Sequence, residues 1–160
     1  MKVEGIVFDM DGTLANLGGF VDWGRAYHRA KGAYLECGCP PEMIEGLGES
    51  NLFNLMNRVR DENVRSMTEE AVWDIQDSVY AEVEACELEG VDRCGLMPGC
   101  LSALDWIRDR GIAMGVATSN SELVAEKVLG SVGIKDYFSA IVGRRPELRM
   151  KPYPDQILVC

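Results

Sequence analysis

Short apolar runs alternate with amphipathic stretches along this 160-residue chain. The first run, KVEGIVF at residues 2–8, shows little polar alternation from Ile6 onward, which is typical of a strand covered on both faces. The run IAMGVATSN at 112–120 has the same buried character, and FSAIVG at 138–143 is a shorter example. Each of these runs predicts a strand.

Helical patterns accompany these runs. Leu101, Leu104 and Ile107 share one face of a helix, and Gly111 is a suitable C-terminal stop for it. Residues 121–134 form a second amphipathic helix, and Asp155 is read as the start of another. Because helices and strands alternate after residue 97, the sequence predicts an α/β fold with a parallel sheet and right-handed crossovers.

Residues 17–96 differ from the rest of the chain in their pattern of apolar and polar positions. The stretches 23–36, 41–48, 49–64 and 68–90 suggest three or four helices. The last of them begins at Thr68, followed by Glu69 and Glu70 in the first turn. Its apolar positions then recur at helical spacing, at Val72, Ile75, Val79 and Val83. We expect a helical insertion over 17–96 between core segments 1–16 and 97–160.

Composition narrows the function classes. The hydrophobic fraction of 47% and charged fraction of 26% are ordinary for a globular protein. A net charge of −10 argues against general nucleic-acid binding, which needs cations to displace phosphate counterions. No stretch approaches the roughly 20 apolar residues of a membrane span, and the N-terminus has no cleavage signal. We therefore expect a cytoplasmic protein without a membrane or nucleic-acid partner.

The cysteines and the single histidine are poor candidates for a site. The spacing of Cys37 and Cys39, and of Cys94 and Cys100, does not match paired zinc ligands. We expect all six cysteines, which include Cys86 and Cys160, to be reduced structural thiols. With His28 as its one histidine, the chain cannot form a histidine-based metal cluster.

The candidate chemistry lies where the predicted strands end, because ligands of parallel sheets bind at the carboxyl ends of the strands. Asp9 and Asp11 follow the first strand and are separated by one residue. Two carboxylates about 4 Å apart repel by roughly 4 kcal/mol at an effective dielectric of ~20, so a cation, a shared proton or water must offset them. The other residues at this rim are Thr118, Ser119, Asn120, Arg144, Arg145, Arg149 and Lys151.

Each of these residues has an ordinary explanation when taken alone. An aspartate pair is commonly a solvated turn, and Ser119 or Asn120 could cap the following helix. Lys151, before Pro152, could be a surface lysine. Their order at successive strand ends instead favours a metal-assisted site for an anionic group.

The chemistry would be phosphoryl transfer. A carboxylate such as Asp9 can attack phosphorus as a covalent nucleophile, and Mg²⁺ prefers such oxygen ligands. Asp11 could protonate the leaving alkoxide and then activate water, while Thr118 binds a phosphoryl oxygen. Lys151 could neutralise the charge on the nucleophile and the phosphate.

Three segments resemble motifs of the haloacid dehalogenase superfamily, in its phosphoglycolate-phosphatase-like branch. They are FDMDGTL at 8–14, GVATSN at 115–120 and RMKPYPDQIL at 149–158. The resemblance implies a Rossmannoid parallel sheet with an inserted helical cap. It implies that Asp9 is the nucleophile and a Mg²⁺ ligand, and that Asp11 is the general acid/base with its backbone carbonyl on Mg²⁺. It further implies that Thr118, with Ser119 and Asn120, binds phosphate and that Lys151 is a charge clamp.

The chain departs from the family pattern after Lys151. The family's fourth motif is an acid-bearing strand beside the first strand, and no such strand precedes Cys160. The resemblance therefore implies a sheet that is incomplete at the C-terminus, reduced activity, and self-association through an exposed first-strand edge.

Three hypotheses follow from this departure. The chain is a shortened version of a Mg²⁺-dependent phosphatase of a small phosphorylated metabolite, or a non-catalytic binding module, or a half-site completed by a partner chain. The substrate's leaving group would meet the cap, where four side chains are either its contacts or a solvated helix face: Arg25, His28, Arg29 and Lys31.

Overall fold

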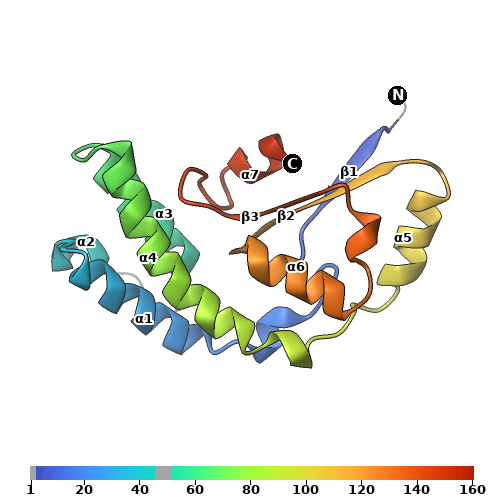
Figure 1. Ribbon diagram of the computed structural model, residues 1–160, viewed down its shortest axis with the longest axis horizontal. Coiled ribbons are helices and arrows are strands. Elements are labelled where there is room, and N and C mark those ends of the chain that lie inside the picture. Colours follow the sequence, from blue (N-terminus) through green and yellow to red (C-terminus); the bar gives the residue numbers. More distant parts are fainter. Residues whose placement is uncertain (1–2, 46–51) are drawn as a thin grey trace.

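The computed structural model describes residues 3–45 and 52–160 (Figure 1). Across these residues, three parallel strands pair in the order β1-β2-β3. The strands are β1 (Gly5–Phe8), β2 (Ala113–Ser121) and β3 (Ala140–Arg144). The central strand β2 pairs with β1 from Gly5↔Ala113 and with β3 from Gly115↔Ala140. The predicted α/β fold with a parallel sheet is confirmed, with strand bounds shifted by one to three residues.

Three helices belong to the sheet: α5 (Cys100–Arg108), α6 (Glu122–Ser131) and α7 (Asp155–Val159). In Figure 1, α6 and α7 lie on opposite sides of the strands. The N-cap of α6 is Ser121, whose Oγ accepts from the Val124 N–H at 3.1 Å. Neither Ser119 nor Asn120 is this cap, so both remain available to the rim of the sheet.

The segment between β1 and α5 is helical, as predicted. It contains α1 (Trp23–Glu36), α2 (Pro41–Ile44), α3 (Leu52–Val64) and α4 (Glu69–Leu88), which we call the cap helices. Short 3-10 turns at Leu17–Phe20, Val91–Arg93 and Lys135–Tyr137 complete the described elements. Thr68 begins α4, because its Oγ1 accepts from the Ala71 N–H at 3.4 Å.

The cap helices and the sheet share one hydrophobic core. Tyr34 and Leu55 of the cap helices belong to the same buried cluster as Leu104 and Leu129 of the sheet helices. The division of the chain into a core domain and a cap domain therefore stays a prediction. Among the described helices, none is long and apolar enough to cross a membrane.

The expectation that β1 is covered on both faces is wrong. Val7 is 42% exposed, and its neighbours Ile6 and Phe8 are only partly buried. The reason is that β1 is at one edge of the described sheet and pairs with β2 alone. Self-association through this edge stays a prediction.

A buried ion pair joins the last turn of α4 to the end of β3. The Arg144 guanidinium donates to both carboxylate oxygens of Glu87, at 3.0 and 2.9 Å, and neither side chain has solvent exposure. Glu87 also accepts from the Asn120 amide group at 3.0 Å and from the Ser121 N–H at 3.3 Å. With four hydrogen bonds, the buried carboxylate is fully paired, as a buried charge must be.

We expect Glu87→Gln to lower the free energy of unfolding by about 3–5 kcal/mol, because it leaves the Arg144 charge buried without a counter-charge. Urea unfolding measures this change. Glu89→Gln is the matched control, since Glu89 pairs with Arg25 at an exposed site and should have little effect. Equal losses of unfolding free energy for the two variants would contradict the conclusion that the buried pair of Glu87 and Arg144 stabilises the fold.

Candidate functional site

Asp9 and Asp11 stand on a tight loop at the carboxyl end of β1. Between them, Met10 is fully buried, and its carbonyl accepts from the N–H groups of Leu14 at 2.8 Å and of Ala15 at 3.1 Å. Gly12 turns the chain with a φ of +75°, a conformation that favours glycine. The anchored loop directs both carboxylates to one cavity of about 320 Å³.

Each of the two carboxylates has its own partner. The Lys151 ammonium, 142 residues away in the sequence, donates to Asp9 Oδ1 at 2.5 Å. The Gly18 N–H donates to Asp11 Oδ1 at 2.7 Å. Burial raises the pKa of Asp11; the Gly18 hydrogen bond opposes this rise, and the charge of Asp9 adds to it. The two carboxyl groups are thus electrostatically distinct: Asp9 lies beside a cation, and Asp11 has a raised pKa.

Gly18 is a part of the site that the sequence reasoning missed. A Cβ at this position would lie 2.3 Å from Asp11 Oδ2, so no side chain fits there without moving the carboxylate. The Gly18 carbonyl also accepts from the Trp23 indole N–H at 3.0 Å. The doubled glycine at 18 and 19 was the available sequence signal, but it does not reveal which glycine faces Asp11.

The end of β2 supplies hydroxyl and amide groups to the same cavity. Thr118 is buried, and its hydroxyl donates to Asn120 Oδ1 at 3.1 Å. The Asn120 amide group is held in turn by Glu87, and the Thr118 carbonyl accepts from the Gln156 side chain at 2.6 Å. Thr118, Ser119 and Asn120 all line the cavity beside Asp9, Asp11 and Lys151, so the structure brings together all six predicted site residues.

The other basic residues predicted at the rim have different roles. Arg144 is buried with Glu87, Arg145 pairs with Glu122, and Arg149 pairs with Asp155. Within the described part of the chain, Lys151 is the one cationic side chain that lines the cavity.

The cap contacts also differ from the four candidates of the sequence. Arg25, His28, Arg29 and Lys31 do not line the cavity, which agrees with a solvated helix face. The cap residues that do line it are Trp23, Phe53 and Asn54.

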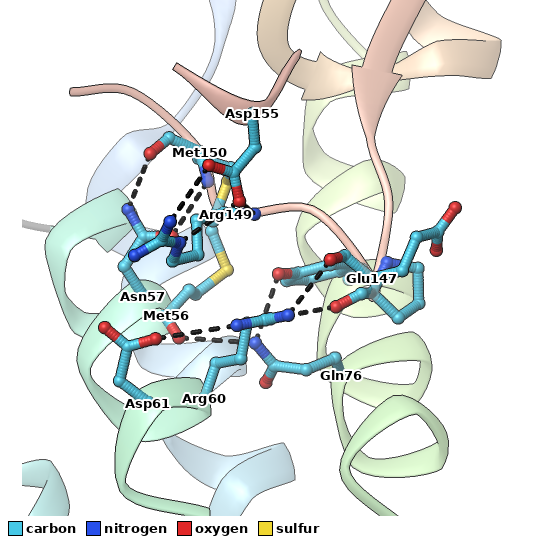
Figure 2. A network of polar contacts seen from close by, with 11 residues as sticks. Met56, Asn57, Arg60, Asp61, Gln76, Glu147, Arg149, Met150 and Asp155 are labelled. Carbon is cyan, nitrogen blue, oxygen red and sulfur yellow. Dashed lines mark hydrogen bonds and ion pairs between the residues drawn. The ribbon is translucent and has the colours of Figure 1, made fainter. Parts of the chain in front are cut away.

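A second network joins α3 to the loop that carries Lys151 (Figure 2). The Asn57 side chain accepts from the Met150 N–H at 2.9 Å and donates to the Met150 carbonyl at 3.0 Å. The Arg60 guanidinium donates to the carbonyls of Pro146 and Glu147, each at 3.0 Å. Because Met150 directly precedes Lys151, a cap helix fixes the backbone from which the lysine reaches Asp9.

The donor set suits a hard divalent cation. Asp9 and Asp11 offer carboxylate oxygens in one cavity, and Mg²⁺ is commonly held by one or two carboxylates, water and substrate phosphate. Within residues 3–45 and 52–160, no group of three or more acidic, cysteine or histidine side chains is placed to hold a metal. Within the described part of the chain, Asp9 and Asp11 are the acidic side chains that line the cavity.

The comparisons agree with this geometry. The sequence profile of the haloacid dehalogenase-like hydrolases matches residues 6–160, so the chain belongs to this family. It is 26% identical over 157 residues to the phosphoglycolate phosphatases of Rhodobacter capsulatus and of Neisseria meningitidis. These matches cover 95% of the chain and 67% and 64% of the two relatives, so the chain spans about two thirds of their length.

Solved structures support the fold. The structure of CbbY from Rhodobacter sphaeroides in complex with phosphate aligns with a TM-score of 0.55 at 19% identity, covering 99% of this chain and 71% of that one. A haloacid dehalogenase-like family protein from Streptococcus pneumoniae aligns with a TM-score of 0.52 at 18% identity, over 98% and 68% of the two chains.

We expect Asn57→Leu to release the Lys151 loop, because it leaves the buried N–H and carbonyl of Met150 without partners. The free energy of unfolding should fall by about 1–3 kcal/mol, and amide exchange at Met150 should accelerate. Glu62→Gln is the control, since Glu62 pairs with Arg65 on the exposed side of the same helix. Unchanged amide exchange at Met150 would contradict the inference that Asn57 holds the Lys151 loop in place.

Proposed function

We propose that this protein hydrolyses small phosphomonoesters through an aspartyl-phosphate on Asp9, with Mg²⁺ as cofactor. The observation that carries the proposal is the meeting of Asp9, Asp11, Thr118 and Lys151, from the ends of three parallel strands, in one cavity. Membership of a hydrolase family and similarity to phosphoglycolate phosphatases support it.

Asp9 is the nucleophile in the proposed reaction. One of its carboxylate oxygens bonds to phosphorus while the bond from phosphorus to the leaving oxygen breaks. Lys151, already on Oδ1, orients the carboxylate and balances the negative charge that gathers there. When bound, Mg²⁺ would be held by the Asp9 carboxylate and the Asp11 backbone carbonyl and would offset the charge of the carboxylate and the phosphoryl oxygens.

Asp11 is the general acid and then the general base in the proposed reaction. Burial raises the pKa of Asp11, which favours its role as the group that gives a proton to the leaving alkoxide. Asp11 is then ionised and takes a proton from water as the water oxygen attacks phosphorus. The bond between phosphorus and the Asp9 oxygen breaks in this second step, which releases inorganic phosphate and restores both aspartates.

The end of β2 would bind the phosphoryl oxygens. Thr118, Ser119 and Asn120 present hydroxyl and amide groups to the cavity, and their loop is fixed by Glu87, Arg144 and Gln156. A preorganised loop of this kind needs no rearrangement as charge develops on phosphorus.

The cytoplasmic location stays a prediction, as do the non-catalytic module and the half-site completed by a partner chain. No specific contact among the described residues favours either alternative over the hydrolase.

We expect the full chain to release phosphate from p-nitrophenyl phosphate in a reaction that EDTA abolishes. Asp9→Asn should lower the rate at least about 10³-fold, because the amide is not a nucleophile. Asp109→Asn, at the exposed end of α5, serves as the control. Wild-type turnover by Asp9→Asn would refute the mechanism.

We expect Gly18→Ala to lower kcat about 10²-fold, because its methyl group would displace the Asp11 carboxylate. Gly19→Ala is a matched control at the next position, where a Cβ meets no atom within 4 Å. Steady-state kinetics of both variants test this, and equal rates would show that the Asp11 position does not matter.

A further inference from the structure

The cap helices contribute an uncharged, partly aromatic lining to the cavity. It consists of Trp23, the first residue of α1, and of Phe53 and Asn54 near the start of α3. The Trp23 and Phe53 rings form an edge-to-face pair with centroids 5.6 Å apart. The hydrogen bond from the Trp23 indole to the Gly18 carbonyl fixes the larger ring. A ligand in this cavity therefore meets a preformed aromatic surface.

The cations of the cap helices are engaged elsewhere. Five arginines have these partners: Arg25 binds Glu89, Arg29 binds Glu82, Arg58 binds the carbonyls of Met43 and Glu45, Arg60 binds those of Pro146 and Glu147, and Arg65 binds Glu62. Lys31 lies over the Tyr27 ring, against which His28 also packs. The sequence of residues 46–51, which lie outside the described part, contains no lysine, arginine or histidine.

The charges that line the cavity determine which kind of leaving group the site favours. Lys151 is the one cation among the described lining residues, and it is already paired with Asp9. A second anionic group on the substrate would meet no cation among the described cap residues that line the cavity, and leaving it unpaired is unfavourable in a partly desolvated site. An uncharged ring would instead bury apolar surface against Trp23 and Phe53.

Taking the proposed phosphomonoesterase activity as its basis, we infer that the preferred substrate is the phosphomonoester of an uncharged alcohol whose ring presents an apolar face. An aromatic ring and the C–H face of a carbohydrate ring share this chemistry. Phosphoglycolate, with a carboxylate on its leaving group, is a poor match to this lining.

Non-hydrolysable phosphonates test the inference without any contribution from leaving-group reactivity. Binding to the full chain is measured by calorimetry with Mg²⁺ present. The probes are inorganic phosphate, phosphonoacetate, benzylphosphonate and the phosphonate analogue of glucose 6-phosphate. We expect at least one ring-bearing probe to bind about tenfold more tightly than phosphonoacetate, which is about 1.4 kcal/mol. The two ring-bearing probes distinguish an aromatic from a carbohydrate substrate.

A variant that adds a positive charge to the cavity lining tests recognition of the substrate separately from folding of the protein. Asn54 is exposed, and Asn54→Arg should tighten phosphonoacetate binding about tenfold more than it tightens the binding of inorganic phosphate. Phe53→Leu should weaken the ring-bearing probe and leave phosphonoacetate unchanged.

The outcomes distinguish the two proposals. If phosphate binds but phosphonoacetate binds as tightly as both ring-bearing probes, the inferred substrate class is wrong and the phosphatase proposal stands. If inorganic phosphate itself fails to bind, the proposed function fails, and the inference fails with it.

Discussion

The repulsion between two carboxylates, separated by one residue at the end of β1, is the constraint around which the site is arranged. Asp9 is balanced by a lysine from the far end of the chain, and Asp11 by a backbone N–H seven residues away. These partners differ in kind, since one is a full charge and the other a dipole. The two carboxyl groups therefore have different surroundings, and burial raises the pKa of Asp11. This difference is what the proposed roles of nucleophile and proton donor require.

The cap helices build the site as well as cover it. Asn57 of α3 holds the backbone next to Lys151, and Glu87 of α4 holds Asn120 at the end of β2. Because these contacts are buried, losing either would leave polar groups unpaired. The loops that line the cavity and the helical insertion are thus energetically coupled, although about 90 residues separate Asn57 from its partner.

The sequence was informative wherever a local signal decides the structure. Thr68 with its acidic first turn marks the start of α4, and the motif around Lys151 identifies the cation of the site. The sequence was uninformative where packing between distant segments decides. Gly18 and Glu87 look ordinary in the sequence because their importance depends on which atoms the fold brings beside them. For the same reason β1 looks buried in the sequence, since its apolar residues do not reveal how many strands lie beside it.

The ion pair between Glu87 and Arg144 has a mechanical consequence. Because Glu87 also accepts from the Asn120 amide group, the C-terminal end of α4 and the end of β2 share one buried anchor. Pulling α4 away from the sheet would break these contacts together, so a displaced cap helix would also disturb the rim of the cavity.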